Sequence, residues 1–220
     1  MEKINKILFY RIALIIIFLV LIFISFQNIN YKKNIKEEYL FLGDSITERY
    51  NLQRYYSNYP IINSGIGGDK TIDILENMDN RVYKYKPNKV ILLIGINDFT
   101  HNESVDYVYN NIVKIISGIK EKFPNCKIYV QSIYPINDFW SENYGSQTSP
   151  GVRNINDKVK EENDKLKKYC DKNKLTYVDV FSSLSLENGY LKDEYTEDGI
   201  HLSEEGYKEV TYIIKKNVFY

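Results

Sequence analysis

The chain has 220 residues, which suits one domain and leaves too little length for two ordinary domains with linkers. Charged residues make up 26% and hydrophobic residues 44%, a balance that excludes disordered, collagen-like and low-complexity chains. Two cysteines cannot form a disulfide framework. The two histidines, His101 and His201, are the only side chains available for imidazole chemistry.

The formal net charge of zero conceals an asymmetry between the two ends of the chain. Residues 1–36 hold six basic and one acidic side chain, which leaves 23 basic and 28 acidic side chains in residues 37–220. Nucleic-acid binding needs clustered Lys and Arg to contact phosphates. The acidic body has no basic stripe, so no nucleic-acid partner is expected.

An apolar run opens the chain. Residues 12–26 contain no charge, and extending the run back to residue 7 gives 20 residues with Arg11 as the one charged member. At about 1.5 Å per helical residue this length crosses a hydrocarbon core of about 30 Å. A cleaved signal peptide is the alternative, although no small-x-small cleavage pattern follows the run. We expect residues 1–36 to form an uncleaved membrane anchor with a short linker.

The basic residues around this run indicate its orientation. Three precede or enter it and three follow it within ten residues. The N-terminal cluster usually dominates for a first helix, which favours a cytoplasmic N-terminus. The expectation is a single-pass protein of the cell membrane with residues 37–220 outside the cytoplasm.

From residue 37 onward, strand-like and helix-like segments alternate. Five apolar runs predict strands at residues 38–43, 60–63, 89–95, 127–132 and 175–180. Near-continuous apolar runs are typical of strands buried on both faces of a parallel sheet. Apolar stripes at helical spacing occupy residues 104–123, 155–169 and 207–214. This alternation predicts a three-layer α/β/α sandwich, with residues 137–151 as a surface loop.

Four short motifs follow the predicted strands or stand near the C-terminus. They are Gly-Asp-Ser-Ile-Thr at 43–47, Asn-Ser-Gly-Ile-Gly-Gly-Asp at 63–69, Gly-Ile-Asn-Asp at 95–98, and Asp-Gly-Ile-His at 198–201. Each is a weak signal alone, because glycine turns and helix caps are common. In an open parallel sheet, ligands bind at the C-terminal ends of the strands. The four motifs in this order therefore predict an active site at that edge.

With these motifs the chain resembles the SGNH hydrolases, the superfamily of GDSL esterases and lipases, and in particular their platelet-activating-factor acetylhydrolase-like branch. The resemblance covers residues 38–216. It implies a flavodoxin-like five-stranded parallel sheet of order 2-1-3-4-5 and serine-dependent hydrolysis of small acyl esters. Ile46 replaces the leucine common in the family, a near-isosteric change.

The resemblance also implies a role for five residues. Ser45 matches the nucleophile, Asp198 the acid and His201 the base. The oxyanion hole falls on Gly68, on the Asn97 amide and on the N–H of Ser45.

General chemistry supports these assignments. A serine hydroxyl is a weak nucleophile until a base within hydrogen-bond reach takes its proton, and His201 is the one plausible base. Asp198, three residues earlier, can accept a hydrogen bond from the other ring nitrogen and fix the tautomer. Preorganised donors around the developing oxyanion are worth about 10²–10³ in turnover each.

Four nearby polar residues are not assigned a catalytic role. Asp44 is interpreted as a hydrogen-bonding residue under the turn, Asp69 and Asp98 as helix caps rather than metal ligands, and His101 as a surface or pocket-rim residue. Tyr134, after the fourth predicted strand, is a candidate pocket residue.

Three aromatic residues stand in the predicted loop 137–151: Phe139, Trp140 and Tyr144. They suit sugar stacking or an acyl-chain contact, or Trp140 only packs the loop down. Cys126 and Cys170 are interpreted as buried free thiols, with a disulfide as the alternative.

The predicted function is a serine esterase that removes acetyl or other short acyl groups from a carbohydrate or cell-envelope polymer, with no cofactor and no metal. Its partners are an acyl ester or acylated glycan and, through the N-terminal helix, the membrane. The first alternative is O-acyl transfer to envelope polysaccharide beside a membrane acyltransferase partner. From another class, a catalytically silent binding module is the second alternative. A metal phosphoesterase is not expected, because it would need several His and Asp ligands at strand ends and one histidine there is too few.

Overall fold

The structure is a computed structural model that describes residues 14–23, 38–145 and 150–219. The chain divides into two units, Met1–Glu37 and Glu38–Tyr220. In the first unit residues 14–23 form a helix, and the remainder of the predicted anchor lies outside the described residues. Within the part of the chain that the structure describes, no helix has the length and apolar character needed to span a bilayer. The structure therefore gives the predicted transmembrane helix no support.

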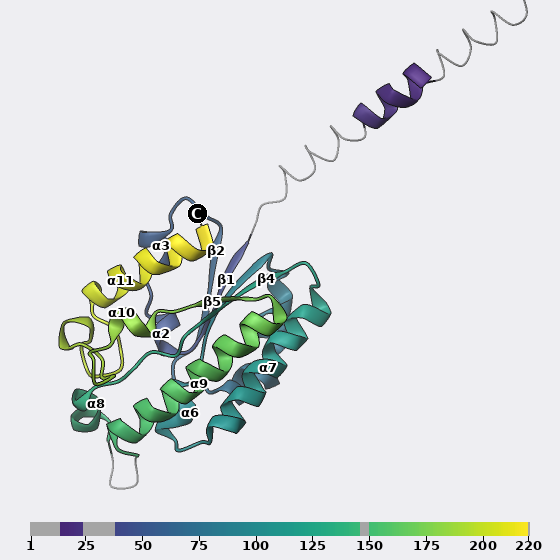
Figure 1. Ribbon diagram of the computed structural model, residues 1–220. Coiled ribbons are helices and arrows are strands. Elements are labelled where there is room, and N and C mark those ends of the chain that lie inside the picture. The colour runs from purple at the N-terminus through teal and green to yellow at the C-terminus, as the bar shows by residue number, and fades with distance from the viewer. Residues whose placement is uncertain (1–13, 24–37, 146–149, 220) are drawn as a thin grey trace, which may run out of the picture. The chain divides into compact units, whose positions relative to one another are not determined.

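In the second unit five parallel strands form one sheet of order β2-β1-β3-β4-β5, as predicted (Figure 1). The strands are β1 (Tyr39–Gly43), β2 (Ile61–Gly65), β3 (Lys89–Leu93), β4 (Lys127–Gln131) and β5 (Thr176–Val178). All residues of β1 and β3 are buried. Strands covered on both faces need apolar side chains on both faces, which explains their unbroken apolar runs.

Helices pack against both faces of this sheet (Figure 1). On one face α4 (Thr71–Glu76) packs against α7 (Val105–Lys122), and α7 packs against α9 (Val152–Asn173). On the other face lie α2 (Ser45–Glu48), α3 (Leu52–Tyr55) and α11 (Glu204–Ile214). Right-handed crossovers between parallel strands place helices in these layers.

The remaining elements are short. They are α5 (Met78–Arg81), α6 (Ile96–Thr100), α8 (Asp138–Asn143), α10 (Phe181–Leu184), the 3₁₀ turns Tyr83–Tyr85 and Asp193–Tyr195, and a π-helical turn Lys215–Phe219. The helix α8 corrects the prediction of an irregular loop over residues 137–151. Asn137 caps it, because its side chain accepts a hydrogen bond from the backbone N–H of Phe139 at 3.1 Å.

The two cysteines are buried free thiols. Burial raises the pKa of the Cys126 thiol to about 11 and that of the Cys170 thiol to about 12. Both side chains therefore stay protonated near neutral pH and act as small apolar residues of the core.

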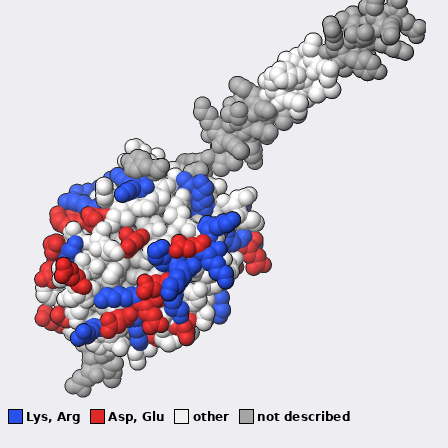
Figure 2. All heavy atoms as spheres, in the orientation of Figure 1, with Lys and Arg blue, Asp and Glu red and all other residues white. Residues whose placement is uncertain are grey.

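On the face of the molecule in Figure 2, Lys and Arg side chains alternate with Asp and Glu side chains. Charges of both signs are close together there, so this face presents no extended basic surface to a polyanion.

One acidic side chain lies in the core without compensation. Glu162 on α9 has no exposed surface, and neither carboxylate oxygen has a hydrogen-bond partner among the described residues. Burial raises its pKa to about 8, against the opposing effect of Lys165. An unpaired buried carboxylate is costly in its charged form, so the folded chain keeps Glu162 protonated at neutral pH.

This burial predicts a pH-dependent loss of stability. Between its ordinary pKa of 4.5 and the raised value of about 8, the unfolded chain ionises Glu162 while the folded chain retains the proton. The unfolded state then binds fewer protons, so the free energy of unfolding falls as pH rises, by at most about 1.4 kcal/mol per pH unit. Glu162→Gln should flatten this slope in urea titrations between about pH 5 and pH 8. Glu161→Gln, an exposed neighbour, is the matched control, and equal slopes in wild type and Glu162→Gln would refute the assignment.

Candidate active site

The turn between β1 and α2 presents a serine at the C-terminal edge of the sheet. Asp44 caps α2, since its Oδ1 accepts the backbone N–H of Ile46 at 3.0 Å. Ser45 is the first residue of the helix. Gly43 is required before them, because a Cβ there would lie 2.3 Å from the carbonyl oxygen of Leu93. The predicted structural role of Asp44 under the turn is confirmed.

A second loop, immediately before α11, presents an aspartate and a histidine. The hydroxyl of Thr196 donates to the carbonyl of His201 and accepts the N–H of Gly199, both at 2.8 Å. Asp198 Oδ1 accepts the backbone N–H of His201 at 2.8 Å. These contacts close residues 196–202 into a tight loop that fixes both side chains relative to each other.

The structure brings the serine and this pair together across 156 positions of sequence. His201 Nε2 lies 2.9 Å from Ser45 Oγ, and His201 Nδ1 lies 2.6 Å from Asp198 Oδ2. Both ring nitrogens are thus engaged, one by the hydroxyl and one by the carboxylate. An imidazole held in this way can take a proton from the serine while the carboxylate stabilises the resulting positive charge.

The two other residues predicted for the oxyanion hole lie in the same cavity as Ser45 and His201. Gly68 has a φ of +81°, a left-handed conformation that favours glycine. The side-chain nitrogen of Asn97 donates to the carbonyl of Asp69 at 2.9 Å. One of its two N–H donors is therefore used to fix the amide, and the second is left for an acceptor in the cavity.

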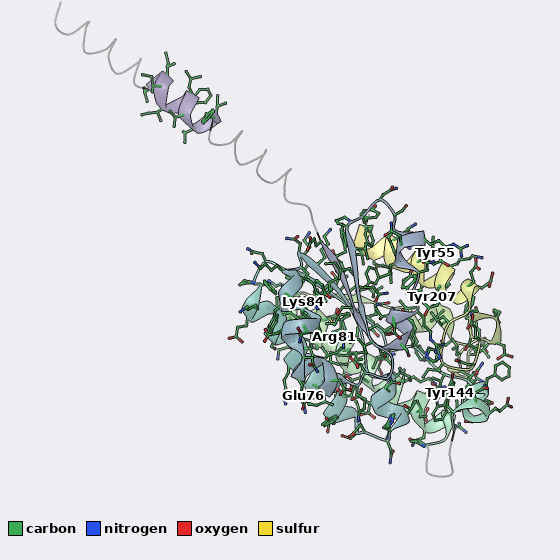
Figure 3. All side chains as sticks on the ribbon, turned by 180° about the vertical axis from the view of Figure 1, so that it is seen from behind. Tyr55, Glu76, Arg81, Lys84, Tyr144 and Tyr207 are labelled. Carbon is green, nitrogen blue, oxygen red and sulfur yellow. The ribbon has the colours of Figure 1, made fainter. Side chains whose placement is uncertain are left out.

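Arg81, at the end of α5, connects these loops, and sequence reasoning missed it (Figure 3). Its guanidinium is buried and donates to the carbonyls of Gly43 at 2.8 Å and Ser64 at 2.6 Å. It also forms an ion pair with the carboxylate of Asp69. One buried cation therefore fixes two loops that lead into the cavity, just before Asp44 and just after Gly68.

The carboxylates of Asp69 and Asp98 do not cap the helices that follow them. Asp69 pairs with Arg81, and α4 begins at Thr71 after Lys70. Asp98 accepts the backbone N–H of Thr71 at 3.0 Å and its hydroxyl at 2.6 Å. It thus caps the start of α4 from a different strand end, so the predicted capping role is confirmed for Asp98, although for another helix than the one after it, and is wrong for Asp69.

Asp44 and Asp198 differ in charge state. Burial raises the pKa of Asp44 to about 7, and its Oδ2 has no hydrogen-bond partner in the described part of the chain. For Asp198, burial alone would raise the pKa, but hydrogen bonds from the backbone and ring of His201, from Ile200 and from Tyr144 hold it below its ordinary value. Near neutral pH the carboxylate beside the imidazole is therefore ionised, whereas Asp44 is only partly ionised.

The cavity has a volume of about 670 Å³ and is lined by both polar and apolar side chains. Besides Ser45, Gly68, Asn97 and His201, its lining includes Glu48, Arg49, Thr100, His101, Asn102, Trp140, Tyr144 and Ile200. His101 is at the rim, as predicted.

Of the aromatic residues considered as pocket residues from the sequence, Tyr134 lies outside the cavity and Trp140 lines it. Tyr134 does not line this cavity, because it is buried in the core and its hydroxyl donates to Gln131 Oε1 at 2.6 Å. Trp140 lines the cavity with only 4% of its surface exposed. Among the described residues, no group of three or more His, Cys, Asp or Glu side chains is placed to hold a metal ion.

Known proteins resemble this chain in sequence and in structure. A protein of Streptococcus pneumonia, assigned provisionally as a platelet activating factor, is 32% identical with a TM-score of 0.73, over 87% of this chain and 88% of that one. A provisionally assigned acylhydrolase from Bacteroides fragilis is 26% identical with a TM-score of 0.72, over 83% and 86%. Platelet-activating factor acetylhydrolase IB subunit alpha1 of Bos taurus is 26% identical over 108 residues, 47% of this chain. That match spans 46% of the bovine protein, less than half of its length.

The model of one protein family matches residues 41–209, a range that contains every residue placed in the site above. The chain belongs to the GDSL-like lipase/acylhydrolase family.

Proposed function

We propose that the protein is a serine esterase that hydrolyses short-chain acyl esters through an acyl-enzyme. The observation that carries this proposal is the continuous contact from Ser45 Oγ to His201 Nε2 at 2.9 Å and from His201 Nδ1 to Asp198 Oδ2 at 2.6 Å. The same side chains line a cavity wide enough for a small ester.

In the first half-reaction Ser45 Oγ attacks the ester carbonyl carbon while His201 Nε2 takes the serine proton. The N–H groups of Ser45 and Gly68 and the amide of Asn97 are the proposed donors to the tetrahedral oxyanion. Collapse breaks the bond to the alcohol, which leaves with the proton from His201. Water then attacks the acyl-enzyme while His201 takes its proton. Collapse releases the acid, and His201 returns the proton to Ser45 Oγ.

For the substrate we propose an O-acetyl or similarly short ester of a polar alcohol such as a carbohydrate. The support is the composition of the cavity wall, where Glu48, Arg49 and Thr100 offer hydrogen-bonding groups. A long acyl chain would need a predominantly apolar wall, whereas a hydroxyl-rich alcohol can use these polar groups.

The proposed cellular location of the enzyme rests on the N-terminal sequence alone. We propose that residues 1–36 hold the enzyme at the cell membrane, with the hydrolase domain outside the cytoplasm, because the uncharged run 12–26 follows a basic N-terminus. No contact among the described residues favours a sugar hydroxyl over water as acyl acceptor, so hydrolysis is the proposed outcome and no acyltransferase partner is proposed.

The nucleophile can be tested by covalent labelling. A fluorophosphonate probe should add once to the wild type, and Ser45→Ala should abolish both the mass increase and the hydrolysis of aryl acetates, by about 10⁴-fold or more. Ser182→Ala is the matched control, because Ser182 is exposed and its hydroxyl donates to Asp179 at 2.6 Å without any histidine. Labelling that persists in Ser45→Ala would reject the proposed nucleophile.

The oxyanion role of Asn97 predicts a loss confined to turnover. Asn97→Asp replaces a donor by a carboxylate beside the developing negative charge, so kcat should fall by at least about 10²–10³ while KM changes little. Asn102→Asp puts the same charge into the same cavity and should retain kcat within a few-fold. If both variants lose the same activity, general electrostatics rather than a specific donor explains the effect.

Burial of Trp140 predicts that its role is mainly to pack α8. Trp140→Ala should reduce hydrolysis of an acetylated sugar and of a plain aryl acetate by similar factors and lower the free energy of unfolding by about 3–5 kcal/mol. Phe139→Ala, next to it and 39% exposed, should change both far less. A loss seen only with the acetylated sugar would instead show that the indole stacks on the substrate.

A further inference from the structure

One oxygen of the proposed acid has more partners than a serine–histidine–aspartate relay requires. Asp198 Oδ2 accepts the His201 ring at 2.6 Å and also the hydroxyl of Tyr144 at 2.9 Å. The Arg49 guanidinium lies 3.8 Å from the same oxygen. The other oxygen, Oδ1, is occupied by the backbone N–H groups of Ile200 and His201.

Tyr144 comes from a different part of the chain than the rest of this cluster. It follows the last residue of α8, and its side chain is labelled at the edge of the domain in Figure 3. Half of its surface is exposed, yet its hydroxyl is directed at Asp198, and its ring lies edge-on to the His201 ring at 6.2 Å. The tyrosine therefore contacts both the acid and the base and also lines the cavity.

We propose that Tyr144 is a positioning residue whose hydroxyl holds the Asp198 carboxylate and reduces the negative charge available to His201, and so sets the pH at which the base becomes active. The inference rests on the proposed esterase function. Two donors that share one carboxylate oxygen each make a weaker contact, because both draw on the same negative charge. Without the hydroxyl, Asp198 would stabilise the protonated imidazole more strongly.

The charge states of the two partners support this role. The hydrogen bond to Asp198 raises the pKa of Tyr144, so the hydroxyl keeps its proton and remains a donor above neutral pH. Donation to Asp198 in turn adds to the hydrogen bonds that keep the carboxylate ionised. Near neutral pH Tyr144 is therefore a neutral donor and Asp198 a charged acceptor.

Other ionisable groups line the cavity or adjoin the site. Arg49 lies at the end of α2, while Glu48 and His101 line the cavity wall. Glu197 adjoins Asp198 in sequence, and Asp44 is buried behind Ser45. Arg49 is the important rival, because a guanidinium near Asp198 also disfavours a protonated imidazole. Its side chain is 48% exposed, so its effect acts partly through water and is screened by salt.

The test is Tyr144→Phe, which keeps the ring and removes the hydroxyl. The midpoint of the acid limb in the pH profile of kcat/KM should move upward by about 0.3–1 pH unit, while kcat/KM well above that limb changes less than about threefold. Tyr212→Phe, on α11 and 65% exposed, is the matched control and should leave the midpoint in place. If Tyr144 only secures α8, the variant will lower activity at all pH values without moving the midpoint, and the proposal is then wrong.

Measurement at high salt distinguishes the effect of the Tyr144 hydroxyl on the midpoint from that of Arg49. In about 1 M NaCl the Debye length falls to about 3 Å, so a through-water contribution is largely screened while a direct hydrogen bond persists. The shift caused by Tyr144→Phe should therefore remain at high salt. A shift that disappears in 1 M NaCl would assign the effect to the surrounding charges and overturn the role of the hydroxyl.

A second measurement does not depend on turnover. The protein has only two histidines, so a His101→Gln variant assigns the ring signals of His201 in an NMR titration. Tyr144→Phe should raise the midpoint of that titration by the same amount as it raises the kinetic one. If the midpoint moves but no ester is hydrolysed, the inference holds and the proposed function fails. If esters are hydrolysed and neither midpoint moves, the inference fails and the function holds.

Discussion

The site depends on the register of three parallel strands. Gly43 at the end of β1 pairs with Gly65 of β2 on one side and with Leu93 of β3 on the other, so the three following loops begin at the same level of the sheet. Arg81 secures this arrangement, because its guanidinium binds Gly43, Ser64 and Asp69 at once. The proposed nucleophile and the proposed oxyanion donors thus inherit their relative positions from the sheet, and a shift of one strand would displace them all.

Two buried ionisable residues, Arg81 and Asp44, lie close to the turn that carries Ser45. Arg81 is compensated by Asp69 and by backbone carbonyls, so removing Asp69 would leave an unpaired charge, a larger loss than removing both partners. Asp44 has no such partner, and burial raises its pKa to about 7. Near neutral pH Asp44 is therefore only partly ionised. This limits the negative charge next to Ser45, where an oxyanion would develop.

The strands could be predicted because burial on both faces leaves unbroken apolar runs, and three of the motifs because those runs lead into glycines and polar side chains. Arg81 could not, since it ends a four-residue helix without apolar periodicity and most arginines lie at the surface. Tyr144 was recognised as an aromatic near the site, but its partner Asp198 is 54 residues away and nothing local in the sequence indicates the contact. Tyr134 shows the reverse error, because an aromatic after a strand can equally fill the core.

Ser45 and His201 are held in place by buried contacts, whereas Tyr144 reaches Asp198 from the surface. This difference determines where substitutions can be tolerated. Tyr207 of α11 donates to the carbonyl of Ile46 at 2.8 Å, and the hydroxyls of Tyr50 and Thr211 lie 2.5 Å apart. These buried contacts join the elements that carry the serine and the histidine, so the Ser45–His201 distance is set by core packing. Tyr144 instead reaches Asp198 from a half-exposed position on a short helix. Substitutions there can alter the proposed base without disturbing the core, whereas a change at Tyr207 or Tyr50 would shift the nucleophile and the fold together.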